Sequence, residues 1–260
     1  MFLETITSRK SAYIRHIRRL ADDGDYRREQ GLFLCDGMKT LREALRFGAQ
    51  VDFVLWRGEP LDADWLDGCE QYAAPGDLFD YASPMKNSPG PLFAVRVRGC
   101  GKPGRLRNAI VLENVQDPGN VGTVIRTANA FGVDAVILTG SCADRYHPKT
   151  VRATMGAVFR QNVICMELAY LGDFLREQGL PLYGAALSCE AVDLRDRSLA
   201  HAAVAVGSEG RGLSDELLRL CDAQVIIPMR PDSESLNAAV AASVLMWEMV
   251  REGGDESCLL

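Results

Sequence analysis

Histidine and paired cysteines, from which most zinc sites are built, are scarce in this 260-residue sequence. It has three histidines, and none of its eight cysteines lies in a CxxC pair or at ligand spacing from a histidine. Scattered cysteines in a chain that is not exported are typically reduced thiols in or near the core. We therefore expect no metal site and no disulfide framework.

Long apolar runs are also missing. No stretch approaches the roughly 18 apolar residues that a membrane helix needs. The N-terminus, MFLETITSRKS, lacks the basic-then-apolar order of a secretory signal. With 47% hydrophobic residues and a mean hydropathy of −0.05, the composition is that of a soluble globular protein. These features exclude a membrane protein and predict a cytoplasmic location.

Net positive charge is absent too, since the chain carries −6 at pH 7. That balance disfavours a general nucleic-acid coat protein, but RNA affinity depends on local charge rather than on the total. Basic residues do gather in SRKSAYIRHIRRLADDGDYRREQG, where Ile14, Ile17 and Leu20 predict a helix capped by Thr7 or Ser8. A solvated helix face and an RNA contact explain this basic run equally well. On the exposed side and in the turn beyond we expect Arg9, Lys10, Arg15, Arg18, Arg19, Arg27 and Arg28.

Strand and helix patterns alternate on both sides of one linker candidate. Strands at GLFLCDG, VDFVLWRG and LFAVRVRG, with a helix over residues 38–47, predict a small α/β domain. The segment RGCGKPGRLRN is rich in glycine, proline and charge, as linkers are. We therefore expect a first domain over residues 1–97, a linker over 98–107 and a second domain over 108–260.

The second domain predicts a parallel sheet. Near-continuous apolar strands separated by helical stretches are typical of parallel sheets that are buried on both faces. The expected strands are NAIVLENV, VDAVILTG, QNVICMEL, LPLYGAAL, AVAVGSE and AQVIIPM.

A first chemical motif covers residues 112–138, LENVQDPGNVGTVIRTANAFGVDAVIL. It predicts a strand, a turn at residues 117–119, a helix capped by Asn120 and a stop at Gly132. Arg126 lies opposite the apolar face of that helix, where a guanidinium can hold a phosphate. A plain surface arginine also explains that residue taken alone.

A second motif covers residues 204–218, VAVGSEGRGLSDELL. Glycines after a strand let backbone amides approach a ligand. The order G-x-x-G-x-G is nevertheless not the dinucleotide fingerprint G-x-G-x-x-G. A nucleotide-like ligand and a plain tight turn both fit this loop.

The third motif covers residues 223–250, AQVIIPMRPDSESLNAAVAASVLMWEMV. Pro228 frees the neighbouring backbone from the strand ladder, so that this edge can hydrogen-bond an adenine between apolar walls at Met229 and Leu236. The alanine-rich helix beyond fits core or subunit packing for most of its length.

In this order, the three segments resemble the SpoU (TrmH-like) family of RNA 2′-O-ribose methyltransferases, of the SPOUT class. The matching pieces are NVQDPGNVGTVIRTANAFG, VGSEGRGLSDELL, IPM and SLNAAVAAS. The segments SRKSAYIRHIRRL, GLFLCDGMKTLREAL and SPGPLFAVRV look like the accessory substrate-binding domain of that family.

The resemblance implies a knotted (trefoil) parallel-sheet methyltransferase domain, an obligate homodimer and S-adenosylmethionine as methyl donor. Gly207, Ile227 and Leu236 match the family's donor-binding positions, and Met229 would line the same pocket. Pro231 stands where many members have glycine, so the loop after Met229 is expected to differ locally. The polar set implied for catalysis comprises Arg126, Asn120, Glu209, Ser235 and Asn237.

The sequence thus predicts methyl transfer to a ribose 2′-hydroxyl of structured RNA, with ribosomal RNA favoured by analogy. Arg126 would anchor a phosphate rather than act as a base, because a guanidinium stays protonated. The RNA-binding residues would be Arg9, Lys10, Arg15, Arg18 and Arg19. The alternatives are a tRNA 2′-O-methyltransferase, a base methyltransferase and a catalytically silent RNA-binding protein of the same fold. A Rossmann dehydrogenase lacks its fingerprint here.

Overall fold

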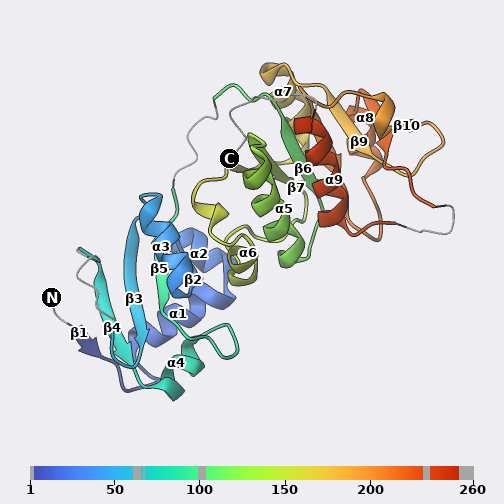
Figure 1. Cartoon of the computed structure of the whole chain (residues 1–260). Helices are drawn as coiled ribbons and strands as arrows, with labels where there is room; N and C mark the ends of the chain where they lie inside the picture. Colours follow the sequence, from blue (N-terminus) through green and yellow to red (C-terminus); the bar gives the residue numbers. More distant parts are fainter. Residues whose placement is uncertain (1–2, 61–65, 67, 99–103, 231–234, 252–260) are drawn as a thin grey trace. The chain divides into compact units, whose positions relative to one another are not determined.

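The computed structural model describes residues 3–60, 66, 68–98, 104–230 and 235–251 (Figure 1). The chain forms two compact units, Met1–Gly99 with Tyr146–Phe159, and Cys100–Arg145 with Arg160–Leu260. Residues 146–159 therefore pack with the first unit, although they fall inside the range expected for the second domain. Half of the expected linker, residues 99–103, lies outside the described residues.

A five-stranded mixed sheet in the order β1-β4-β3-β5-β2 forms the centre of the first unit. β4 runs parallel to β1 and β3, whereas β5 runs antiparallel to β3 and β2. The three strands expected from the sequence are present, and β1 and β4 join them. The strands are β1 (Leu3–Thr5), β2 (Leu32–Asp36), β3 (Val51–Arg57), β4 (Glu70–Ala74) and β5 (Leu92–Arg96).

Helices cover both faces of this sheet because successive strand residues point to opposite sides. Phe53 and Leu55 of β3 pack into the core beneath α1, and Val54 and Trp56 pack into the core beneath α3. Residues 146–159 join the second core through Val151 and Phe159. The helices are α1 (Ala12–Asp22), α2 (Gly24–Gln30), α3 (Met38–Arg46), α4 (Gly76–Ala82), α6 (Pro148–Ala153) and the 3-10 turn η1 (Ala157–Phe159).

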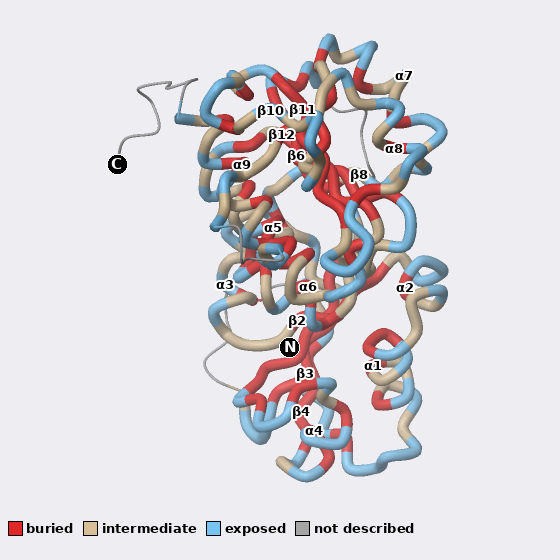
Figure 2. Tube along the Cα trace, turned by 90° about the vertical axis from the view of Figure 1, so that its right-hand side faces the viewer, coloured by how far each residue is buried: buried red, intermediate tan, exposed pale blue. Residues whose placement is uncertain are grey.

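The second unit contains the expected parallel sheet, in the order β10-β12-β9-β11-β6-β7-β8. All of its paired strands run parallel. Every residue of β6 and β7 is buried, as their unbroken apolar runs require (Figure 2). The strands are β6 (Ala109–Glu113), β7 (Ala135–Thr139), β8 (Val163–Cys165), β9 (Leu182–Ala185), β10 (Val192–Asp193), β11 (Ala203–Val206) and β12 (Ala223–Ile226).

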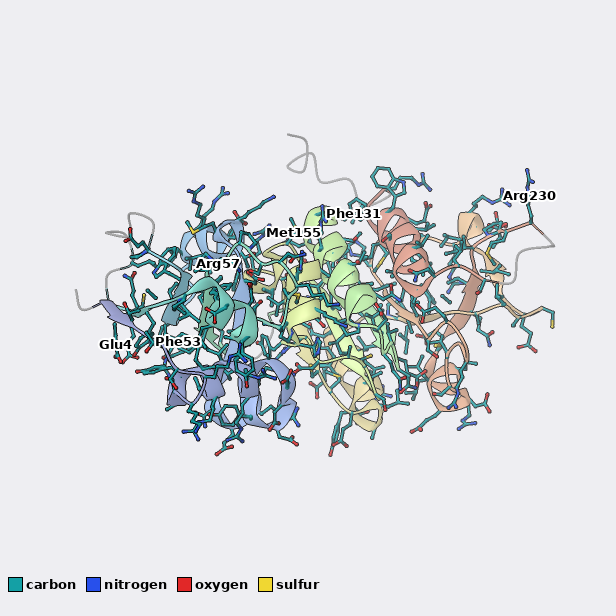
Figure 3. All side chains as sticks on the ribbon, turned by 90° about the horizontal axis from the view of Figure 1, so that it is seen from below. Glu4, Phe53, Arg57, Phe131, Met155 and Arg230 are labelled. Atoms are coloured by element: carbon teal, nitrogen blue, oxygen red, sulfur yellow. The ribbon has the colours of Figure 1, made fainter. Side chains whose placement is uncertain are left out.

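Two helices of this unit, α5 and α9, lie side by side (Figure 1). Phe131 at the end of α5 (labelled in Figure 3) meets the Trp247 ring of α9 edge-on, with the ring centroids 5.6 Å apart. Gly132 ends α5 in the left-handed conformation at φ +73°, as expected. The helices are α5 (Pro118–Phe131), α7 (Leu168–Gln178), α8 (Asp215–Leu220), α9 (Ala238–Arg251) and the 3-10 turn η2 (Leu194–Asp196).

The described cysteines are all free thiols. Cys35 is buried and Cys221 is half-buried, and burial raises the pKa of Cys221 to about 12, so that its thiol stays protonated. Cys165 and Cys189 are exposed, so the expectation that the cysteines lie in or near the core is wrong for these two. None of the helices in the described part of the chain has the length and apolarity needed to cross a membrane.

Candidate active site

The glycine loop after β11 closes tightly on itself. The Gly212 N–H donates to the carbonyl oxygen of Ser208 over 2.8 Å, with Gly212 at φ +66°. A Cβ on Gly207 would lie 2.1 Å from the carbonyl carbon and oxygen of Gly212. Only glycine therefore lets the backbone of residue 212 approach residue 207 this closely.

This loop also forms one wall of a cavity of about 670 Å³. That volume is within the range of about 300–1,000 Å³ typical of small-molecule sites. The remaining walls come from residues 185–188, 224–227 and 235–236, with Leu218, Met229, Ala238 and Ala241, so distant parts of the chain meet here. Six residues expected from the sequence line it together: Gly207, Glu209, Ile227, Met229, Ser235 and Leu236.

Gln224 of β12 offers a buried acceptor in the cavity wall. Its side chain lines the cavity, and its Oε1 is buried without a hydrogen-bond partner among the described residues. An unsatisfied buried acceptor costs about 1–3 kcal/mol, so a ligand amino or hydroxyl group that reached it would remove a real penalty. The apolar side chains of Ile227, Met229 and Leu236 would flank a flat heterocycle at the same place.

Three polar side chains from separate segments meet beside the cavity. The Asn120 side-chain amide donates to Glu209 Oε1. Asn237 Nδ2 donates to Asn120 Oδ1 over 3.2 Å and lies 3.4 Å from Glu209 Oε1. The same carboxylate oxygen accepts from the Ala238 N–H over 3.3 Å, at the start of α9. Glu209 thus connects the starts of α5 and α9, where helix dipoles favour negative charge.

Asn120 does not cap α5, which corrects the sequence interpretation. The cap is Asp117, whose Oδ1 accepts from the Asn120 N–H over 2.8 Å, and the helix begins at Pro118. Asp117 occupies the capping position because proline, which lacks an N–H, fits the first turn directly after it. The Asn120 side chain is thereby left to contact Glu209 and Asn237.

Arg126 is not part of this cluster. It is exposed on α5, and among the described residues it neither lines the cavity nor bonds to Asn120 or Glu209. Ser235 lines the cavity but is not in the hydrogen-bonded cluster. Pro231, the departure from the family pattern, lies outside the described residues.

Sequence reasoning missed Glu113, at the end of β6. It is 2% exposed, and its carboxylate accepts from the Ser214 N–H over 2.7 Å and from the Ser214 hydroxyl over 2.6 Å. Ser214 in turn caps α8 directly after the glycine loop. The available signal was a single acidic residue ending an otherwise apolar strand, since a buried charge needs partners.

The expected basic helix is α1, capped by Ser11 rather than by Thr7 or Ser8. The side chain of Ser11 reaches the N–H of Tyr13, two residues into the helix. Arg27 is buried and donates to the carbonyl oxygens of Leu20 and Ala21, which corrects its expected exposure. Arg9, Lys10, Arg15 and Arg19 are exposed, and Arg18 is half-exposed.

A shallow groove of about 430 Å³ runs between α5 and α9. Its α9 side presents apolar residues to solvent: Val240, Val244 and Trp247, of which Trp247 is 55% exposed. Asn120 and Asn237 also line it, so the groove begins at the polar cluster. Within the described chain, no group of three or more His, Cys, Asp or Glu residues is placed to hold a metal ion.

Comparison with known proteins identifies related sequences and folds. The model of the SpoU rRNA methylase family matches residues 107–247. The chain is 32% identical over 248 residues to the 23S rRNA (guanosine(2553)-2′-O)-methyltransferase RlmP of Bacillus subtilis, covering 95% of this chain and 99% of that protein.

Two solved structures have the same fold over nearly the whole chain. The AdoMet-bound rRNA methyltransferase of Sinorhizobium meliloti superposes with a TM-score of 0.84 at 27% identity, over 96% of this chain and 98% of that one. The AdoMet complex of the SpoU methyltransferase AviRb from Streptomyces viridochromogenes gives 0.85 at 26% identity, over 94% and 98%.

Proposed function

Because the chain belongs to the SpoU rRNA methylase family, we propose that it transfers a methyl group from S-adenosylmethionine to a ribose 2′-hydroxyl of ribosomal RNA. The observation that carries this proposal is the single cavity in which Gly207, Ile227 and Leu236 meet. These residues come from two motifs, and the cluster of Asn120, Glu209 and Asn237 adds the third. A ribosomal substrate also fits the cytoplasmic location expected from the sequence.

The donor would bind in the 670 Å³ cavity. The residues present suit it: the apolar side chains at 227, 229 and 236 can flank the adenine, and Gln224 Oε1 offers an unused acceptor. The glycine loop would lie against the part of the donor beyond its adenine, since glycine permits close approach of the backbone. When bound, S-adenosylmethionine supplies an electrophilic methyl group.

The protein's own contribution would be alignment of the ribose and handling of its proton. The 2′-hydroxyl must lose its proton during transfer, and a guanidinium cannot take it up. Arg126 would hold the adjacent phosphate by paired N–H bonds, and this phosphate would accept the proton. Glu209, held by Asn120 and Asn237, would fix the ribose at the cavity mouth.

The experiment that tests the function measures labelled methyl transfer from S-adenosylmethionine to ribosomal RNA that lacks its modifications. Label should appear in alkali-resistant dinucleotides with wild type and disappear with Arg126→Ala. Arg126→Lys should also lose most of its turnover, because lysine cannot make paired contacts to a phosphate.

Other results would redirect or end the proposal. Label on tRNA but not on ribosomal RNA would change the substrate. Label released as a methylated base would contradict ribose chemistry. Failure to bind the donor in calorimetry would favour the alternative of a catalytically silent RNA-binding protein.

The homodimer expected for this family would use the groove between α5 and α9. Its exposed apolar side chains, Val240, Val244 and Trp247, are what an interface would bury. Arg126 lies on α5 and does not line the cavity of its own chain. In a dimer formed across the groove, Arg126 of one copy would act at the cavity of the other copy. Trp247→Glu should then give a monomer in analytical ultracentrifugation, whereas Tyr170→Glu, at an exposed position on α7, should not. A dimer that persists in Trp247→Glu would place the interface elsewhere.

The return of the chain from β12 to α9 supports the proposed trefoil knot. β12 pairs with β9 towards one edge of the sheet, whereas α9 packs on α5 and β11. The described residues on either side of positions 231–234 therefore lie at different strands of the sheet. Ordinary connections do not thread through loops, so this part of the proposal depends on family membership.

A further inference from the structure

An exposed tyrosine in the first unit lies beneath two arginines. Tyr81, near the end of α4, is 38% exposed. The guanidinium carbon of Arg9 lies 4.7 Å from the centre of its ring, and that of Arg18 lies 4.3 Å from it. Arg18 also donates to the Tyr81 carbonyl oxygen over 3.2 Å. Residues far apart in the sequence therefore build one flat, cationic surface.

The two arginines keep their charge available. Within the described chain neither Arg9 nor Arg18 forms an ion pair with a carboxylate. A neighbouring pair differs: Arg19 lies 3.7 Å from the Tyr26 ring centre but is 3.8 Å from the Asp23 carboxylate. Arg19 is thus partly neutralised, whereas the surface at Tyr81 retains two positive charges.

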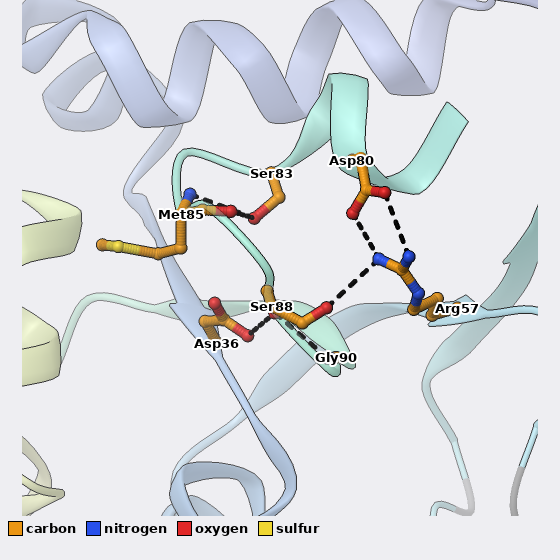
Figure 4. Close-up of polar contacts among 7 residues, drawn as sticks. All are labelled: Asp36, Arg57, Asp80, Ser83, Met85, Ser88 and Gly90. Atoms are coloured by element: carbon orange, nitrogen blue, oxygen red, sulfur yellow. Dashed lines mark hydrogen bonds and ion pairs between the residues drawn. The ribbon is translucent and has the colours of Figure 1, made fainter. Parts of the chain in front are cut away.

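The residue next to Tyr81 is tied to the sheet of the first unit. Asp80, its chain neighbour, pairs with Arg57 of β3 through two contacts, of which the Nη2–Oδ2 one is 3.0 Å (Figure 4). Arg57 donates as well to the Ser88 carbonyl oxygen, and the Ser88 hydroxyl donates to Asp36 over 2.5 Å. These contacts anchor the backbone that carries Tyr81, so less of the chain has to be ordered when a ligand binds.

We infer that Tyr81, with Arg9 and Arg18, is a stacking site for an unpaired base of the RNA substrate. Unpaired bases are recognised by stacking on aromatic rings and guanidinium planes, and an arginine can stack while its N–H groups bind phosphate. The inference rests on the proposed function, and it adds that the first unit reads a loop, bulge or single-stranded segment rather than a paired helix.

The test measures binding of two fluorescent RNA probes to the full-length protein: a single-stranded oligonucleotide of mixed sequence and a blunt-ended duplex of the same length, which offers no unpaired base. A stacked base contributes about 1–3 kcal/mol, so Tyr81→Ala should weaken single-strand binding by about 5- to 150-fold. Tyr81→Phe should bind nearly as wild type. Tyr170→Ala, at a tyrosine that is 64% exposed in the second unit, is the matched control and should have no effect.

Salt dependence separates stacking from charge. Arg18→Gln should reduce the slope of log affinity against log salt by about 0.7, whereas Tyr81→Ala should leave the slope unchanged. Single-strand binding by Tyr81→Ala within twofold of Tyr170→Ala would overturn the inference, and so would an equal loss on the duplex. In either case, methyl transfer by the wild type would leave the proposed function standing. A wild-type protein that binds neither probe and methylates no RNA would overturn both.

Discussion

Gly207→Ala should disturb the glycine loop, because the structure leaves no room for a side chain at residue 207. The new Cβ would lie 2.1 Å from the Gly212 carbonyl carbon and oxygen and 2.5 Å from the Leu213 nitrogen. All three atoms belong to backbone, so no flexible side chain can move aside. The loop over residues 207–212 must therefore open, and with it one wall of the 670 Å³ cavity.

The size of the effect follows from the cost of that displacement. Forcing one extra methyl group into close packing costs about 1–3 kcal/mol. In the free protein the loop can relieve part of this strain by moving. Donor binding needs the loop in its original position as a wall of the cavity, so the strain returns when the donor binds. We therefore expect donor affinity to fall by about 5- to 150-fold. The melting temperature should fall as well, by about 2–4 °C for each kcal/mol.

The matched control is Gly210→Ala in the same loop. Nothing lies within 4 Å of a Cβ at residue 210, so this variant should melt as wild type does. The assays are thermal unfolding of both variants and isothermal titration calorimetry of Gly207→Ala and wild type with S-adenosylmethionine. Wild-type donor affinity together with a wild-type melting temperature for Gly207→Ala would refute the reasoning, because it would show that the loop is not packed as described.

Two further predictions concern buried polar groups. Glu113→Ala should lower the free energy of unfolding by about 2–3 kcal/mol in urea titrations, because the Ser214 N–H and hydroxyl lose their charged acceptor; Ser214→Ala, which keeps the N–H, should cost less. Burial lowers the pKa of His16 below its usual 6.5, so the unfolded chain binds more protons and the free energy of unfolding should fall as pH drops through 6.5. His16→Gln should remove that part of the pH dependence and His201→Gln, at an exposed position, should not; identical profiles for all three proteins would contradict this.

Hydrophobic pattern predicted six of the seven strands described in the second unit, missing the two-residue β10, and three of the five described in the first. β6 and β7 are apolar up to their last residues, Glu113 and Thr139, and burial of both faces satisfies such runs. β4, with the sequence EQYAA, offers neither branched side chains nor alternation, so it was missed. Its place in the sheet depends on pairing with β3, and long-range pairing leaves no local signal. The packing of residues 146–159 with the first unit was invisible for the same reason.

The candidate site also contains residues that the sequence predicted and residues that it did not. The family resemblance carried by the glycine loop and the IPM and SLN segments led to the residues that line the cavity. Gln224 and Glu113 were missed because their significance depends on burial, which one sequence does not show. Asn120 was given the wrong role, since Asp117 three residues earlier is an equally good cap.

The contacts of Glu209 connect donor binding to the docking of α9. One carboxylate oxygen accepts from Asn120, lies near Asn237 and caps the N–H of Ala238, while the residue itself lines the cavity. The cavity mouth therefore exists only when the glycine loop, the start of α5 and the start of α9 are all in place. A ligand that binds only this assembled state stabilises it by mass action. Donor binding should accordingly stabilise α9, and with it the α5–α9 groove proposed for the second copy, although none of the groove residues lines the cavity proposed for the donor.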